Sequence, residues 1–304
     1  MVPLLHLCAL EFRGADAAAF LQNQLTNDVA ELAPLHWQRG AYCNVKGRVL
    51  ANFLLLRDAQ SYTMILSASL GEAIRAQLQK FVLRMQVTLQ HRDVVLFGVV
   101  GPDAARIALS HWGDHTALEQ GGVYVMGATQ CLCLAPGSLV AIVESAHACA
   151  AWQSLAARLQ PAGCDAWLAQ EIERDIPLVT HATQAMFLPQ MLGLDRLGAV
   201  SFRKGCFPGQ EIVARARYLG EVKRHLWRGV AALGAVAVEA QPVFGAAAGT
   251  ESVGIVINAA LLANGNCTIL AVINDAKDSP RELFLDAADG TRVRLRDQAE
   301  MARA

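Results

Sequence analysis

The chain has 304 residues, of which 54% are hydrophobic and 17% charged, and its formal net charge is −1. This composition excludes an intrinsically disordered protein, and the near-neutral charge excludes polyanion binding through overall charge alone. The mean hydropathy is +0.30, but the densest apolar runs, at residues 52–56 and 94–100, are far too short to span a bilayer. Residues 1–10 lack the basic start of a signal peptide, so we expect a cytoplasmic protein without a membrane partner.

Strands and helices follow one another irregularly through the first half of the chain. Period-two apolar patterns and turn signals predict strands at residues 4–12, 41–45, 48–57, 61–66, 86–90, 94–100 and, as a three-strand meander, 123–143. Helical periodicity and capping residues predict helices from residue 16 and at 69–84, 104–109, 146–159 and 165–174. Because this order lacks strict strand–helix–strand repetition, we expect an α+β fold.

The character of the chain changes after residue 224. Short strands separated by Gly, Asn and Pro are predicted at residues 226–231, 236–240, 252–257, 267–273 and 292–296. Such a run of short strands is typical of a separate small β domain, with a barrel as the leading candidate.

The eight cysteines are scattered, and none forms a C-x-x-C pair. No pair of histidines flanks them at the spacing of metal ligands, so no metal site is expected. Unpaired cysteines in a chain without a signal peptide fit a reducing compartment.

Cys206 is the candidate for a reactive thiol. Arg203 and Lys204 lie directly before it, and Pro208-Gly209 then breaks the chain ahead of a predicted helix at residues 210–218. Cations and a helix N-terminus both stabilise a thiolate. The competing interpretation is an inert cysteine beside a basic turn.

Positive charge is concentrated around this cysteine. Residues 196–228 contain eight Lys and Arg against Glu211 and Glu221, a local excess of six positive charges. Such a stretch suits a ligand rich in carboxylates or a nucleic-acid backbone. The alternative is a solvated basic surface, above all for Lys223, Arg224 and Arg228. Direct RNA binding is a further alternative, although the run shows no interleaved aromatic residues expected to be exposed for base stacking.

The segment around Cys206 also carries a specific motif. Residues 204–215, Lys-Gly-Cys-Phe-Pro-Gly-Gln-Glu-Ile-Val-Ala-Arg, resemble the K-G-C-[YF]-x-G-Q-E-x-x-A-R signature of the YgfZ family of folate-binding, iron–sulfur-maintenance proteins. Three weaker matches support it, at residues 20–29 (F-L-Q-x-Q-x-T-x-D-V), at Lys46-Gly47-Arg48, and at 171–177 with 187–190. Together they run from about residue 4 to residue 228.

More distantly, the chain is similar to the T protein of the glycine cleavage system, a folate-dependent aminomethyltransferase. The resemblance implies a three-domain cloverleaf around a central folate channel. Residues 1–223 would form a discontinuous α+β folate-binding region of two interleaved subdomains, and 224–304 a C-terminal β-barrel. T proteins carry an acidic pair shortly after the Gly47 turn, where this chain has Ala51 and Asn52. Without a carboxylate to handle the proton at the folate nitrogen, aminomethyl transfer is the second candidate rather than the first.

The resemblance implies roles for individual residues. It implies that Glu173 accepts hydrogen bonds from a pterin ring; a solvated helix glutamate is the alternative. Lys204 and Arg215, with Arg217 as a further candidate, suit the anionic folate tail. The remaining ligand-binding candidates are the motif residue Gln210, Asn27 and Asp28 as caps or channel residues, and Lys46 at a hairpin tip.

The function implied is that of a tetrahydrofolate-binding protein that supports iron–sulfur enzymes, including enzymes that modify tRNA, with Cys206 as the reactive centre. Its expected partners are therefore folate and the iron–sulfur client enzymes. A cysteine hydrolase would need a histidine base near Cys206, and no histidine lies between His181 and His225.

Overall fold

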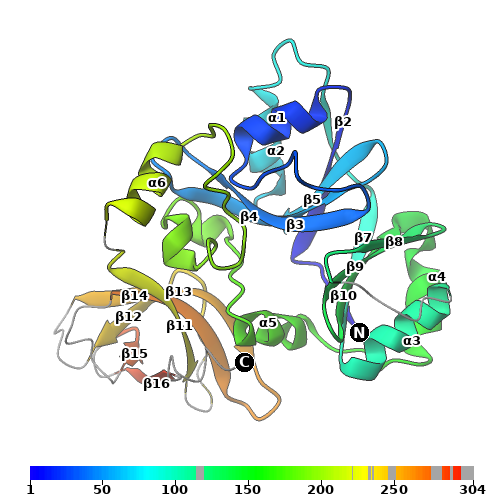
Figure 1. The fold of residues 1–304 in the computed structure, drawn as a ribbon. Helices are drawn as coiled ribbons and strands as arrows, with labels where there is room; N and C mark the ends of the chain where they lie inside the picture. Colours follow the sequence, from blue (N-terminus) through cyan, green and yellow to red (C-terminus); the bar gives the residue numbers. More distant parts are fainter. Residues whose placement is uncertain are drawn as a thin grey trace.

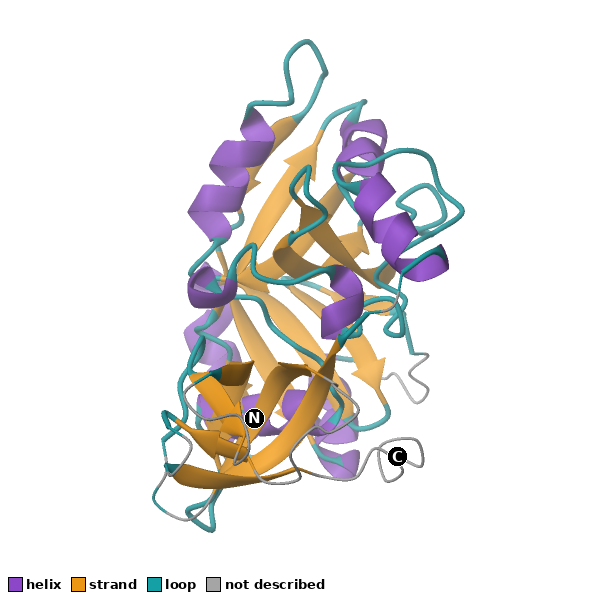
Figure 2. Ribbon diagram, turned by 90° about the vertical axis from the view of Figure 1, so that its left-hand side faces the viewer, coloured by secondary structure: helices purple, strands orange, loops and turns teal. Residues whose placement is uncertain are grey.

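The fold, seen in a computed structural model, has three lobes around a centre (Figure 1). The structure describes residues 1–113, 120–220, 222–231, 234, 236–245, 251–274, 283–287 and 290–295. Some helices flank the strands, and shorter helices lie near the centre of the molecule (Figure 2). The α+β class and the predicted C-terminal barrel are both confirmed.

The first lobe is a five-stranded sheet in the order β3-β4-β5-β2-β6. All its pairings are antiparallel, and helices α1 and α2 belong to the same lobe (Figure 1). Its elements are β2 (Leu7–Arg13), α1 (Ala17–Gln24), β3 (His36–Cys43), β4 (Val49–Arg57), β5 (Ser61–Ser67), α2 (Gly71–Gln79) and β6 (Thr88–His91). Every residue of β5 is buried because the sheet is covered on both faces.

The second lobe is another five-stranded antiparallel sheet, in the order β1-β7-β10-β9-β8. Its elements are β1 (Val2–Pro3), β7 (Val94–Val100), α3 (Pro102–Trp112), β8 (Val123–Met126), β9 (Thr129–Ala135), β10 (Ser138–Glu144) and α4 (Ser145–Ala156). The single strand predicted at residues 4–12 is therefore wrong at its start, because a turn around Leu5 sends β1 and β2 into different sheets.

The third lobe is a closed six-stranded barrel. Its strands are β11 (Arg224–Ala231), β12 (Pro242–Gly245), β13 (Ser252–Leu261), β14 (Cys267–Asn274), β15 (Leu283–Leu285) and β16 (Thr291–Leu295). The strand predicted at 236–240 is wrong: Ala240 has a left-handed φ of 63°, and Gln241 Oε1 accepts a hydrogen bond from the amide of Val238 at 2.9 Å. The strand predicted at 292–296 corresponds to β16, and Arg296 lies outside the described residues.

The segment between the second lobe and the barrel runs through the centre of the molecule (Figure 1). It contains α5 (Cys164–Glu173), the short 3₁₀ helices η1 (His181–Thr183) and η2 (Pro189–Leu192), and α6 (Gln210–Tyr218). Helix α5 lies between the barrel and the second lobe (Figure 1), and its Ile172 belongs to the main hydrophobic core while Trp167 packs with β1, β7 and β10. One short helix thus borders both neighbouring lobes.

Candidate functional site

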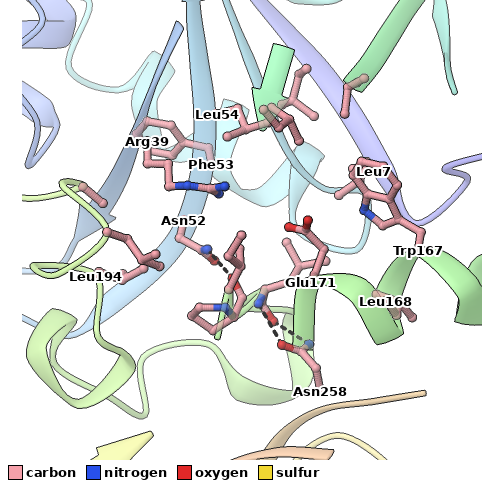
Figure 3. A pocket seen from close by; sticks show the side chains of 18 of the residues that line it. Leu7, Arg39, Asn52, Phe53, Leu54, Trp167, Leu168, Glu171, Leu194 and Asn258 are labelled. Atoms are coloured by element: carbon pink, nitrogen blue, oxygen red, sulfur yellow. Dashed lines mark hydrogen bonds between the residues drawn. The ribbon is translucent and has the colours of Figure 1, made fainter. Parts of the chain in front are cut away.

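A cavity lies where the three lobes meet. Strands β3, β4 and β5, helix α5, the segment 176–178 and strand β13 all contribute residues to its lining. Its walls are mainly apolar, with Phe53, Leu54, Trp167, Leu168 and Leu194 among the side chains (Figure 3). A mainly apolar cavity with a few convergent polar groups is typical of a small-molecule site.

Glu171 and Arg39 are the charged side chains among the described residues that line the cavity. They approach it from opposite sides, Glu171 from α5 and Arg39 from β3 (Figure 3). Glu171 Oε1 is buried without a hydrogen-bond partner. Burial raises the pKa of Glu171, against the opposing effects of Arg39 and Arg174, and burial lowers the pKa of Arg39. A buried carboxylate oxygen without a partner is costly, and so it indicates a place where a ligand supplies donors.

Two asparagine side chains that line the cavity form hydrogen bonds to the backbone of residues 177–179. Asn52 donates to Pro177 O at 2.7 Å and accepts from the Val179 amide at 2.8 Å. Asn258, from the barrel, accepts from the Leu178 amide at 2.8 Å and donates to Leu178 O at 2.9 Å. Because these bonds use both polar atoms of each amide group, the two side chains act as anchors of the 177–179 backbone.

Asn27 lies directly behind the cavity wall. Its side chain is 2% exposed, and neither its oxygen nor its nitrogen has a hydrogen-bond partner. A Cβ atom added to the cavity-lining Gly40 would lie 2.4 Å from Asn27 Oδ1. Glycine at position 40 therefore leaves room for this amide.

A thiol–imidazole pair lies at the same wall. Cys164 is the first residue of α5, and its Sγ is 3.0 Å from Nδ1 of His6, a residue that lines the cavity. Burial lowers the pKa of His6 to about 4 and is the main cause that raises the pKa of Cys164. The two groups therefore form a neutral hydrogen-bonded pair near pH 7.

Glu173 is placed differently from Glu171, although the two are only two positions apart in the sequence. It is not among the described residues that line the cavity. Its Oε2 accepts a hydrogen bond from Arg228 of the barrel at 2.9 Å, and the Arg228 Nε lies 3.4 Å from Asp175 Oδ1. Arg228 is only 4% exposed, so it is not part of a solvated basic surface as the sequence suggested.

Lys204 points into the protein. Its ammonium group donates to the backbone oxygens of Gln22, Leu25 and Asn27 at and beyond the end of α1. A cation at this place satisfies carbonyl groups that a helix C-terminus leaves without partners. Burial lowers the pKa of Lys204 to about 8. All three donors are therefore engaged inside the fold.

The Cys206 segment lies on the surface, against the Lys46 turn. Cys206 is exposed, and it precedes Gly209, which has φ +79° and caps the start of α6. A Cβ atom on Gly209 would lie 2.3 Å from Asn44 O and 2.6 Å from Gly47 Cα. Two motifs that are far apart in the sequence are therefore in direct contact, and only glycine allows this approach.

The remaining predicted residues lie on the surface or support turns. Lys46 and Arg215 are exposed and Gln210 is half-buried, whereas Asp28 accepts a hydrogen bond from Gln22 at 2.9 Å. The eight predicted site residues are thus spread over the cavity's surroundings and the α6 surface, and none is among the described residues that line the cavity. The described part of the chain also contains no cluster of His, Cys, Asp and Glu suited to a metal ion.

The sequence prediction did not include Glu171, Arg39, Asn258 or the His6–Cys164 pair. A signal for Glu171 was present, because Leu168, Glu171 and Ile172 follow the i, i+3, i+4 spacing of one helix face. Arg39 and Asn258 carry no comparable signal, since only the tertiary fold brings β3 and β13 to the same cavity.

The comparisons with known proteins agree with this architecture. The crystal structure of glycine cleavage system aminomethyltransferase T from Bartonella henselae matches 97% of this chain and 83% of that chain, with a TM-score of 0.79 and 16% identity. The protein therefore has the fold of glycine cleavage T proteins. Residues 2–134 match the family described as the GCVT N-terminal domain.

A closer relationship follows from sequence. The chain is 35% identical over 217 residues to the tRNA-modifying protein YgfZ of Escherichia coli O157:H7 (strain EC4115 / EHEC), and equally to that of Escherichia coli (strain K12). The sequence is therefore similar to that of the YgfZ proteins. The match covers 70% of this chain and 66% of each relative, slightly less than two thirds of their length. In the described part of the chain, no helix is both long and apolar enough to cross a membrane.

Proposed function

We propose that this protein binds a reduced folate in the central cavity and supports iron–sulfur enzymes that modify tRNA. The observation that carries the folate assignment is Glu171, whose buried Oε1 lacks a partner inside a mainly apolar cavity, opposite Arg39. The 2-amino and N3 groups of a pterin present two adjacent donors, which a carboxylate can accept as a pair. Arg39 supplies donors for acceptor atoms of the ring, and Leu54, Trp167 and Leu168 supply apolar surface.

This proposal moves the pterin contact from Glu173 to Glu171. The two residues form a matched pair for an experiment, because both are glutamates on α5 and only Glu171 lines the cavity. We expect the Glu171→Gln protein to bind 5-formyltetrahydrofolate about 10- to 100-fold more weakly in a calorimetric titration, the effect of losing a hydrogen bond to a charged group. Glu173→Gln should change the affinity by less than about threefold, within the usual range for a side chain outside the ligand site. The opposite order of effects would refute the proposal.

Aminomethyl transfer is the second candidate, since the fold is that of T proteins. Glu171 is the one carboxylate among the described residues that line the cavity. Asn52, at the position where T proteins carry an acidic pair, has both amide atoms bound to the 177–179 backbone. We therefore propose binding without aminomethyl transfer. A glycine-cleavage assay with purified protein and tetrahydrofolate should give no turnover above the background without enzyme.

The support of iron–sulfur enzymes rests on the relationship to proteins named as tRNA-modifying and on the surface position of Cys206. An exposed thiol outside the cavity can reach a partner protein while a folate is bound. Cys206→Ser should abolish complementation of a strain that lacks YgfZ. Cys149 is also exposed and serves as the matched control. The Cys149→Ser protein should complement fully. Full rescue by Cys206→Ser would remove the role of the thiol.

A further inference from the structure

The surface around α6 combines positive charge with little opposing charge. Its described exposed cations lie on α6 and in the segments before and after it: Arg203, Arg215, Arg217, Lys223 and Arg224. The exposed Lys46 joins them, because its neighbour Gly47 contacts Gly209 and Ile212. Glu211 is the exposed carboxylate within the described part of 203–224. A surface with this excess of cations has the sign of charge that attracts a phosphate backbone.

An exposed aromatic side chain lies within this basic surface. Tyr218, at the end of α6, is 67% exposed, and its ring meets Phe202 edge-on at a centroid distance of 6.0 Å. The Arg217 guanidinium lies 4.6 Å from the Phe202 ring centre and 3.4 Å from Asp195 Oδ2. Because Tyr218 and Arg217 both contact the Phe202 ring, the two side chains lie close to each other. The expectation that this stretch lacks an exposed aromatic for base stacking is therefore wrong.

Tyr218 also lines an open surface pocket. Arg196 and Arg217 contribute donors to its lining, Asp195 contributes an acceptor, and Gln190 and His225 are also present. Its lining shares no residue with the described lining of the central cavity, although its Asp195 and Arg196 lie in the chain between the cavity-lining Leu194 and Leu197. A stacking platform next to a pocket with donors and acceptors fits an unstacked nucleobase better than an acidic protein surface, which would require cations alone.

We propose that this α6 surface binds single-stranded or loop RNA. The cations Lys46, Arg203, Arg215, Lys223 and Arg224 hold the phosphates, while one base stacks on Tyr218 and enters the adjacent pocket. This function is separate from folate binding, because the α6 surface and Glu171 can be altered independently.

The experiment uses the full chain and a fluorescently labelled tRNA anticodon stem-loop, with a duplex of equal length as the comparison. Anisotropy titrations over a series of salt concentrations should give a log–log slope of about −3 to −4 for four to five phosphate contacts. The double variant Arg215→Ala/Arg224→Ala, which removes two of the proposed phosphate contacts, should reduce the slope by about 1 to 2. The control variant Lys80→Ala/Arg84→Ala, which removes two exposed cations of the first lobe, should keep the wild-type slope.

Tyr218 tests the base contact. Tyr218→Ala should weaken loop binding by about 5- to 100-fold and leave duplex binding unchanged, whereas Tyr218→Trp should retain loop binding. Equal effects on loop and duplex, or no effect of Tyr218→Ala, would overturn the base contact. A slope near zero would overturn the RNA surface altogether. Unchanged 5-formyltetrahydrofolate affinity in these variants shows that they are folded, and unchanged RNA binding by Glu171→Gln separates this proposal from the folate site.

Discussion

Replacing Glu171 by leucine should make the protein more stable while it weakens ligand binding. In the absence of a ligand, Glu171 Oε1 is buried and has no hydrogen-bond partner. Leaving such a group unsatisfied costs about 1–3 kcal/mol, so its removal should raise the free energy of unfolding by that amount. The apolar neighbours Leu168, Ile172 and Leu194 can pack against the new side chain. In a unit of this size the gain corresponds to about 2–4 °C in melting temperature for each kcal/mol.

The assay is thermal or urea unfolding with and without 5-formyltetrahydrofolate. At a ligand concentration 100 times the dissociation constant, wild type should gain about 2.7 kcal/mol, and the Glu171→Leu variant should gain much less at the same concentration. The order of stability should therefore reverse on adding the ligand. The matched control Glu173→Leu should destabilise the protein, because it leaves the buried Arg228 without the carboxylate at 2.9 Å.

The effect of Glu171→Leu also depends on pH. Burial raises the pKa of Glu171 above its ordinary value of 4.5. Between the pKa of Glu171 in the unfolded chain and its higher pKa in the native protein, the native protein keeps a proton that the unfolded chain has released. The free energy of unfolding therefore falls as the pH rises through this range. The advantage of the variant over wild type should be smallest below pH 4.5 and should grow above it. A variant less stable than wild type in the absence of ligand at pH 7 would refute the reasoning.

Three further predictions concern the supports of the site. Lys204→Met should lower the free energy of unfolding by about 2–4 kcal/mol in urea titrations, because three backbone oxygens near the end of α1 lose their donor; an unchanged midpoint would contradict this role. Gly209→Ala should increase proteolysis of the segment before α6, since its φ of +79° and the 2.3 Å approach to Asn44 O exclude a Cβ atom; wild-type cleavage rates would count against the contact. Asn52→Asp should lose the donor to Pro177 O, costing about 1–3 kcal/mol, and should not gain glycine-cleavage activity; measurable turnover would contradict this.

The sequence was sufficient for the broad architecture. Period-two patterns and turn residues located most strands of both sheets, and the change of character after residue 224 located the barrel. The main error in the barrel came from Val236 and Val238, whose alternation imitates a strand although both are exposed. The left-handed Ala240 that ends this pattern has no signal in its residue type.

The site was harder to predict because long-range contacts decide the roles of its residues. The charge on Lys204 suggested an anion site, but the position of α1 turns that side chain inward. Glu173 and Glu171 differ in role because α5 rotates by about 200° over two residues, which directs one toward Arg228 and the other toward the cavity. Family motifs drew attention to the segments 171–177 and 204–215, whereas the orientation of each side chain depends on how the three lobes pack together.

The anchors contributed by the barrel have a consequence for how the molecule can be divided. Asn258 and Arg228 both belong to barrel strands, and they hold the 177–179 backbone and the end of α5. A fragment that stops before residue 224 would therefore lack half of the side-chain anchors of the 177–179 backbone, however well its two sheets folded. The barrel is therefore a structural part of the central cavity and not an independent domain added to it. A design that grafts this cavity onto another scaffold would have to include the barrel strands that carry Asn258 and Arg228.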